Sequence, residues 1–186
     1  KEAEKPETIS VTEEKKKTEK NKKSQEPSIP DGMWIKCNTC KNIIYKKEVT
    51  EFKLCPNCGA HFRMSPAERI KIICDEGSFK ELDADMSTKN PMNYPDYDKV
   101  IKKAKAKSGI KEGVVTGECT IGGFKTVIAI MDSHFMMGSM GSVVGEKITR
   151  AIEYSTENEL PIIIFTTSGG ARMQEGIVSL MQMAKT

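Results

Sequence analysis

The hydrophobic positions in the second half of the chain predict a β-hairpin. Residues 114–121 and 124–132 are rich in apolar and β-branched side chains, and they flank the dipeptide Gly122-Gly123. Two glycines between strand-like segments supply the positive φ angles that a two-residue hairpin turn requires. We therefore expect two antiparallel strands joined at this dipeptide.

After the hairpin, the spacing of the apolar residues is first helical and then again strand-like. Apolar residues recur at helical intervals over residues 143–158, and a continuous apolar run follows over residues 161–166. Such a run is typical of a strand that is buried on both faces of a sheet. Residues 167–170 break the run, and residues 171–185 again have near-helical spacing. This order of strands and helices predicts an α/β fold with parallel crossovers.

Three signals predict the start of an earlier helix. Ser65 can cap the helix, Pro66 suits its first position, and Glu68 can complete a capping box. Gly77 is a fitting stop for this helix. A second helix is predicted over about residues 96–107.

Lysines dominate residues 98–112, where six of them stand against only Asp98 and Glu112. The interpretation that we favour is a solvated helix face. A phosphate-bearing ligand close to this segment is the alternative.

Composition divides the chain into three parts. Residues 1–28 hold eight lysines and seven glutamates but only three hydrophobic residues, so we expect a disordered charged tail. Residues 29–64 form a small module with four of the six cysteines, and residues 65–186 hold the α/β part.

The net charge of +3 is too small to create a strong positive electrostatic field, so it does not indicate a nucleic-acid or membrane partner. No apolar run approaches the roughly 18 residues that span a bilayer, so we expect a cytoplasmic protein rather than a membrane protein.

The cysteines give the strongest chemical signal. Cys37 and Cys40 form one C-x2-C pair, Cys55 and Cys58 form another, and fourteen residues separate the pairs. Each pair makes a tight knuckle that aims two thiolates at one point, and two knuckles complete the tetrahedron that Zn²⁺ prefers. Four thiolates leave no position for a catalytic water, so we predict a structural zinc that folds a module with little core of its own.

Other interpretations of this module were weighed against zinc. Two disulfides would need an oxidising compartment, for which nothing in the sequence argues, and an iron–sulfur cluster is the second rival. A zinc ribbon often binds nucleic acid, and this one carries aromatic residues among its lysines. Once the thiolates and Zn²⁺ are counted its charge is close to neutral, so we expect weak nucleic-acid binding and aromatic side chains that cover the ribbon core.

Two glycine-rich segments are candidates for binding an anion. Ser168-Gly169-Gly170 stands between a predicted strand and a predicted helix, where backbone N–H groups and the helix dipole suit a developing oxyanion such as a thioester enolate. The segment from Gly138 to Ser142 is similar, and an ordinary tight turn is the alternative for both. No side-chain triad or acid–base pair accompanies them, and His61 and His134 are expected at polar positions without a catalytic role.

Taken in order, these motifs resemble one known family, the beta subunits of bacterial acetyl-CoA carboxylase carboxyltransferase. The resemblance covers residues 29–186 and rests on four stretches. They are Ile29-Pro30-Asp31-Gly32-Met33-Trp34, the four-cysteine ribbon, the stretch from Met136 to Gly145, and the stretch from Ser168 to Thr186. The resemblance implies a crotonase-like ββα superhelix, of which this chain holds the first part, behind an N-terminal zinc ribbon.

The same resemblance implies an activity and its residues. A carboxyl group passes from carboxybiotin, carried on a separate protein, to acetyl-CoA and gives malonyl-CoA for fatty acid biosynthesis. The amides of Gly169 and Gly170 hold the thioester enolate, and the biotin that has lost CO2 acts as the base. The resemblance further implies four substrate-binding residues, Gly138, Ser139, Gly141 and Arg172. Implied partners are the carboxyltransferase alpha subunit, in an α2β2 heterotetramer, and the biotin carboxyl carrier protein.

Two departures from the family pattern have consequences. Met137 stands where many relatives have a glycine, which affects the turn before Gly138. Relatives continue for about half a domain beyond this sequence, so we expect a fragment that is inactive alone. The alternative functions are a nucleic-acid-binding or regulatory zinc-ribbon module, or a carboxylase for another acyl-CoA such as propionyl-CoA.

Overall fold

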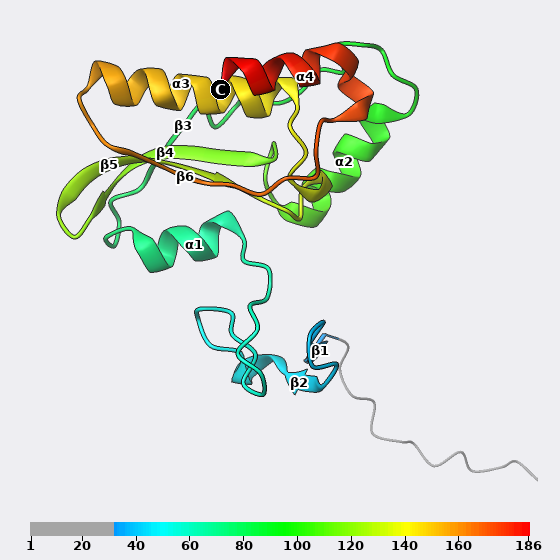
Figure 1. The fold of residues 1–186 in the computed structure, drawn as a ribbon, viewed down its shortest axis with the longest axis vertical. Coiled ribbons are helices and arrows are strands. Elements are labelled where there is room, and N and C mark those ends of the chain that lie inside the picture. Colours follow the sequence, from blue (N-terminus) through cyan, green and yellow to red (C-terminus); the bar gives the residue numbers. More distant parts are fainter. Residues whose placement is uncertain (1–31) are drawn as a thin grey trace, which may run out of the picture.

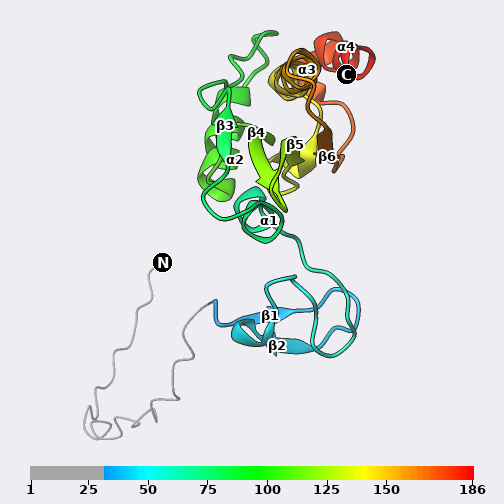
Figure 2. The same ribbon diagram turned by 90° about the vertical axis from the view of Figure 1, so that its left-hand side faces the viewer.

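The computed structural model describes residues 32–186 (Figure 1). The charged tail expected over residues 1–28 lies outside these described residues. Within them the chain forms a small cysteine-containing ribbon and a larger α/β body, and the connection between the two leads into α1 (Figure 2). The predicted boundary at residues 64 and 65 stays a prediction.

The ribbon is built from two very short strands. β1 (Trp34–Lys36) pairs antiparallel with β2 (Ile43–Tyr45), and the 3-10 turn η1 (Lys46–Glu48) follows. A single antiparallel bridge between Leu54 and His61 closes the second knuckle. So little regular structure leaves the ribbon dependent on its side chains for stability.

The core of the ribbon is correspondingly small. Among ribbon residues 32–64, only Cys37, Ile44 and Cys55 are fully buried. The expectation that the aromatic side chains cover this core is wrong for Trp34 and Phe52, which are each 51% exposed. Two of the three core residues are therefore cysteines, and packing alone contributes little.

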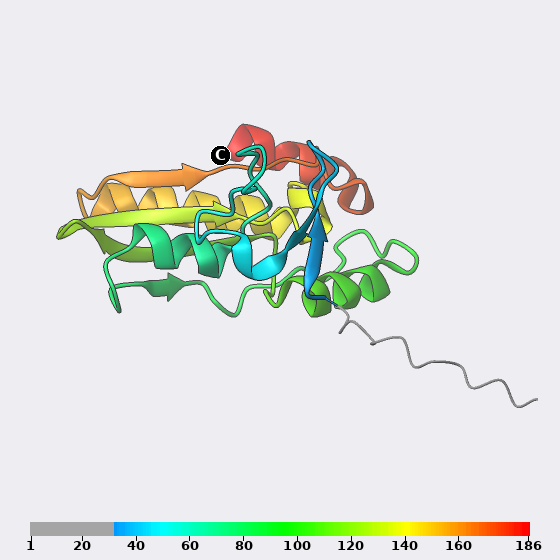
Figure 3. The ribbon, with the colours of Figure 1, turned by 90° about the horizontal axis from the view of Figure 1, so that it is seen from below.

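The body contains one four-stranded sheet in the order β3-β4-β5-β6. β3 (Lys80–Leu82), β4 (Val114–Ile121) and β5 (Phe124–Met131) are antiparallel neighbours, whereas β6 (Ile162–Phe165) runs parallel to β5. Seen from the ribbon side, β3 and β6 lie at opposite edges of the sheet (Figure 3). The parallel crossover from β5 through a helix to β6 confirms the α/β prediction.

The hairpin between β4 and β5 is confirmed at the expected residues. Gly122 and Gly123 have φ angles of +59° and +84°, which side chains rarely adopt. Their N–H groups donate to the two carboxylate oxygens of Asp75, at 2.9 and 2.8 Å. The turn is therefore fixed both by its own backbone and by the segment that follows α1.

Helices cover both faces of the sheet (Figure 1). α3 (Ser142–Glu157) packs its buried Val144 and Ile148 against one face, and α1 (Pro66–Ile73) packs against the other through Ile70. α1 begins with the predicted capping box, in which Ser65 and Glu68 each accept a hydrogen bond from the other's backbone N–H. α2 (Tyr97–Ser108) is also confirmed and packs beside Phe135.

Two expectations for the end of the chain are wrong. β6 is not buried on both faces, because Ile163 is 39% exposed and the other three residues of the strand are half-buried. The last helix, α4 (Gly176–Lys185), begins after Ala171, which is extended and pairs with Met140. A 3-10 turn, η3 (Met173–Glu175), separates that extended segment from α4.

Among the residues that the structure describes, no helix is both long and apolar enough to cross a membrane.

Candidate functional site

The two glycine-rich segments that the sequence singled out lie side by side. Met140 donates its N–H to the carbonyl of Gly170 at 2.9 Å, and Arg172 donates its N–H to the carbonyl of Met140 at 3.0 Å. These bonds form a parallel bridge between Met140 and Ala171. The segment after β5 and the segment after β6 therefore form one unit at the same end of the sheet.

Close approach explains two of the glycines. A Cβ atom on Gly138 would lie 2.5 Å from Cγ2 of Thr167, and φ at Gly138 is +72°. A Cβ atom on Gly169 would lie 3.1 Å from Cβ of Met137. Larger side chains at either position would push the two segments apart.

Gly170 differs, because the space around it is open. Its φ is +82°, it is exposed, and a Cβ atom there would meet nothing within 4 Å. Its N–H donates to the Ser168 hydroxyl at 3.0 Å, whereas the N–H of Gly169 has no acceptor among the described residues. The turn thus presents two backbone N–H donors at an accessible surface. The N–H of Gly170 is bonded to the Ser168 hydroxyl, which can rotate away. The sequence predicted a helix that starts directly after these glycines. This prediction is wrong, because α4 begins only at Gly176.

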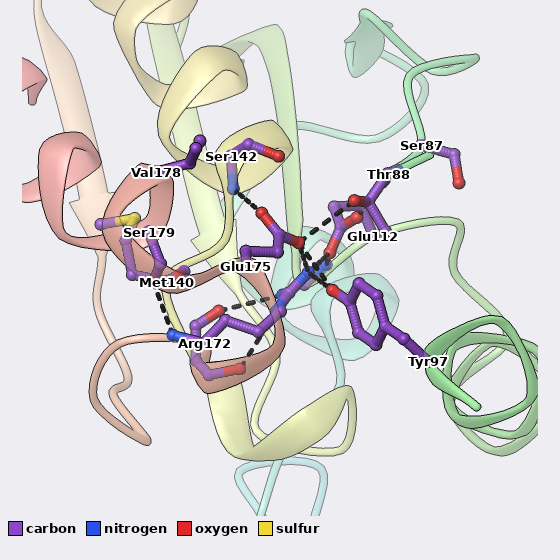
Figure 4. Close-up of polar contacts among 12 residues, drawn as sticks. Ser87, Thr88, Tyr97, Glu112, Met140, Ser142, Arg172, Glu175, Val178 and Ser179 are labelled. Atoms are coloured by element: carbon purple, nitrogen blue, oxygen red, sulfur yellow. Dashed lines mark hydrogen bonds and ion pairs between the residues drawn. The ribbon is translucent and has the colours of Figure 1, made fainter. Parts of the chain in front are cut away.

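A buried arginine holds this unit from behind (Figure 4). The side chain of Arg172 is 0% exposed, and its Nη1 lies 2.8 Å from Oε1 of Glu112 and 3.3 Å from Oε1 of Glu175. Its Nε donates to the Ser139 hydroxyl at 3.2 Å, and its Nη2 donates to the Ser139 carbonyl at 3.0 Å. One guanidinium therefore ties both glycine-rich segments to the segment before β4.

Glu175 completes the network from the other side. It accepts hydrogen bonds from the Tyr97 hydroxyl at 2.6 Å, the Thr88 hydroxyl at 3.1 Å and the backbone N–H of Ser142. Burial alone would raise the pKa of Glu175, but the bonds from Tyr97 and Ser142 lower it below its ordinary value. Because Ser142 is the first residue of α3, this carboxylate lies at the positive end of that helix. The anion that the Gly138–Ser142 segment cradles is thus one of the protein's own side chains.

These contacts give Arg172 a structural role, because its side chain has no exposed surface and positions both glycine-rich segments. Its expected contact with a substrate stays a prediction. Ser139 is 7% exposed and engaged with the same guanidinium, and a Cβ atom on Gly141 would lie 2.6 Å from Cζ of Arg172. Substrate contacts at Gly138, Ser139, Gly141, Gly169 and Gly170 stay predictions.

Sequence reasoning missed four members of this network, Thr88, Tyr97, Glu112 and Glu175. Glu112 in particular was placed on a solvated, lysine-rich face, yet it is 1% exposed. The only sequence signal for the pairing is the spacing of Arg172 and Glu175, three residues apart, which suits an ion pair on one helical turn.

Neither histidine joins the glycine-rich unit by an ion pair or hydrogen bond among the described contacts. Nδ1 of His134 lies 2.7 Å from Oδ1 of Asp132, a residue that is 0% exposed. His134 is therefore half-buried and paired rather than a freely solvated polar residue. His61 is exposed in the ribbon.

The four ribbon cysteines fit a zinc ion. Their sulfur atoms all lie within 4.8 Å of one another, and Cys37–Cys58 and Cys40–Cys55 are 3.7 and 3.8 Å apart. A tetrahedron with Zn–S bonds of about 2.3 Å has edges of about 3.8 Å. Disulfide sulfurs would be about 2.05 Å apart, so the geometry is that of four thiolates around one metal.

Comparison with known families follows the same division of the chain. Residues 61–186 match the family described as carboxyl transferase domain, and residues 34–58 match the acetyl-CoA carboxylase zinc finger domain. The first match covers more than half of the chain. The chain belongs to the carboxyl transferase family. The expected crotonase-like fold with an N-terminal zinc ribbon is thereby confirmed.

Individual carboxyl transferases agree with this assignment. The acetyl-coenzyme A carboxylase carboxyl transferase subunit beta of Desulforamulus reducens is 55% identical over 183 residues, which are 98% of this chain and 63% of the relative. The subunit of the same name in Clostridium kluyveri is 57% identical over 163 residues, 87% of this chain and 56% of the relative. The chain therefore spans about three fifths of the length of these curated relatives.

One solved carboxyl transferase structure also resembles the body. It is transcarboxylase 12S with methylmalonyl-coenzyme A and methylmalonic acid bound, at a TM-score of 0.57 and 32% identity. The match covers 66% of this chain and 22% of that chain.

Proposed function

We propose that this carboxyl transferase chain supplies the acyl-CoA side of acetyl-CoA carboxylation, which gives malonyl-CoA for fatty acid biosynthesis. The observation that carries the proposal is the turn at Gly169 and Gly170. It offers backbone N–H groups at an open surface, while a fully buried ion-pair network fixes it from behind. The names of the relatives and the acyl-CoA in the transcarboxylase structure support the same assignment.

The chemistry of this site requires little from side chains. Loss of a proton from the acetyl methyl group leaves an enolate, and its oxygen needs hydrogen-bond donors already in place. The N–H groups of Gly169 and Gly170 are such donors. In the free protein the Ser168 hydroxyl accepts the hydrogen bond from Gly170, and we expect the enolate oxygen to replace it. The enolate carbon then forms a bond to the carboxyl carbon of carboxybiotin, and the bond between that carbon and the biotin nitrogen breaks. The nitrogen keeps the bonding electrons and takes the proton lost from the acetyl methyl group. The described residues include no side-chain base at this turn, which suits a base supplied with the carboxyl donor.

The proposal includes partners and a location. The alpha subunit, in an α2β2 assembly, and a biotin carboxyl carrier protein would supply the remaining oxyanion donors and the carboxyl group. The relatives' name, subunit beta, supports an assembly of different subunits. Free cysteines grouped for a metal suit a reducing compartment, which supports the cytoplasm.

The test is a carboxyl-transfer assay on the full-length subunit assembled with its partner subunit. Carboxybiotin is the donor, and acetyl-CoA and propionyl-CoA are compared as acceptors, with the partner subunit alone as the control. We expect malonyl-CoA to form only with both subunits present, and acetyl-CoA to be the better acceptor by kcat/KM. A clear preference for propionyl-CoA would contradict the proposed substrate.

The exposed Trp34 and Phe52 favour a second candidate, a nucleic-acid-binding ribbon. We expect such binding to be weak and steeply salt-dependent, because the metal-inclusive charge of the ribbon is small. An assembly with no transfer to either acyl-CoA, but with tight oligonucleotide binding at physiological salt, would favour this second candidate over the enzyme.

A further inference from the structure

A cavity of about 360 Å³ lies where the ribbon meets the body, away from the glycine-rich unit. Its walls come from the ribbon, the start of α1, the end of α2 and the segment after β5. The apolar part of the wall is formed by Ile35, Val49 and Phe62, which also pack on the ribbon core. Neither the zinc site nor the proposed carboxyl transfer uses this cavity.

The cavity carries an excess of positive charge. Lys46, Arg63 and Lys107 line it, and none of them has a carboxylate partner among the described ion pairs. Lys53 also lines it, but its Nζ pairs with Glu68 at 2.6 Å. Burial would raise the pKa of Glu68, yet hydrogen bonds from Lys53 and Ser65 lower it to about 2, so this pair stays neutral as a whole. Three cations from three different parts of the chain therefore line the cavity without a carboxylate partner among residues 32–186.

His134 adds an oriented imidazole to the same wall, whose Nε2 donates to an anion in the imidazolium form. Its Nδ1 is held by Asp132, which is fully buried, and this leaves Nε2 as the ring nitrogen for a ligand. A buried carboxylate that fixes one nitrogen of an imidazole orients the other. The second oxygen of Asp132 has no partner within the described part of the chain, so the pair with His134 is its main polar contact.

We propose that the cavity between the ribbon and the body binds the phosphate group of a small phosphorylated molecule, held by Lys46, Arg63, Lys107 and His134. A dianionic phosphate matches three uncompensated cations and an imidazole better than a monocarboxylate does. The volume exceeds that of a phosphate ion, and the apolar wall suits an organic body attached to it. A ligand here would contact both parts of the chain and fix their relative placement. The lysine-rich end of α2, otherwise a solvated face, would have a partner.

The experiment is a calorimetric titration of the full-length protein with inorganic phosphate, phenyl phosphate and phenol, at constant ionic strength. We expect both phosphate probes to bind saturably and phenol not to bind. Tighter binding of phenyl phosphate assigns the site to an organic phosphate, whereas equal binding assigns it to free phosphate. Saturable binding of neither phosphate probe overturns the proposal.

Matched variants on one helix locate the site. Lys107→Gln should weaken phenyl phosphate binding about tenfold or more, as expected for a lost charge-assisted hydrogen bond. Lys102→Gln makes the same change on the exposed surface of α2, outside the cavity lining, and should leave the affinity unchanged. His134→Asn should also weaken binding, because it removes the imidazole from the cavity wall. Equal losses in Lys102→Gln and Lys107→Gln would mean diffuse electrostatic attraction and would overturn the proposal.

Discussion

Replacing Arg172 with methionine is expected to lower the free energy of unfolding by about 3–5 kcal/mol, the usual cost of breaking a buried ion pair from one side. The change leaves Glu112 and Glu175, at 1% and 0% exposure, without their shared cation. Methionine fills much of the same volume as arginine. The loss of stability therefore comes from the missing positive charge rather than from a cavity. The Ser139 carbonyl and hydroxyl also lose their donors.

Denaturant unfolding monitored by circular dichroism measures this effect. Arg172→Lys should fall between wild type and Arg172→Met, because lysine keeps the charge but lacks the planar fork that reaches both glutamates and Ser139. Arg150→Met is the matched control, since Arg150 pairs with Asp83 and Glu146 at a half-exposed surface. If Arg172→Met were no less stable than Arg150→Met, the network would not hold the site as we describe.

The loss of zinc is the second large effect. Cys55→Ser should abolish stoichiometric zinc and unfold the ribbon, because structural zinc typically contributes about 10–16 kcal/mol of binding free energy to folding. The three fully buried residues of the ribbon core include two of the proposed ligands, Cys37 and Cys55. Without the metal, therefore, almost no core is left to hold β1 against β2.

Metal analysis and hydrogen exchange together test this expectation. The variant should lose protection in the ribbon, while the strands β4 and β5 of the body keep theirs. Cys74→Ser, a change of the same kind in a half-buried cysteine of the body, should keep one zinc per chain. Zinc retained at one per chain after replacement of all four ribbon cysteines would show that the ligands lie elsewhere.

Features that depend on a few neighbouring residues could be predicted from the sequence. The capping box is identified by Ser65 and Glu68, and the hairpin turn is identified by Gly122 and Gly123. The zinc site needs two C-x2-C knuckles, each of which is local. In all three, the chemistry that identifies the feature also stabilises it.

Features that depend on distant partners could not be predicted. The helix pattern over residues 171–185 is real, but the bridge from Ala171 to Met140 holds the first residues extended and delays α4 to Gly176. Arg172 looks like a surface cation beside a ligand loop until Glu112, sixty residues earlier, is brought to it. Even the resemblance to a family does not say which of its motif residues touch a substrate and which hold the others in place.

The most direct test of the proposed function is the rate of carboxyl transfer to acetyl-CoA in the Gly170→Val variant of the full-length assembly. Gly123→Val is a matched control, because Gly123 also has a positive φ, +84° against +82°, and also has open space around it, but lies in the distant β4–β5 turn. The two variants therefore share the backbone cost of a side chain at positive φ. Zinc content and subunit assembly should be unchanged in both.

If the turn stabilises the enolate, Gly170→Val should lower kcat for malonyl-CoA formation by about 10²–10³-fold, the loss typical of removing an oxyanion donor. Gly123→Val should retain a kcat close to that of wild type. A correctly assembled Gly170→Val enzyme with a turnover equal to that of Gly123→Val would contradict the assignment of Gly169 and Gly170 as the enolate donors.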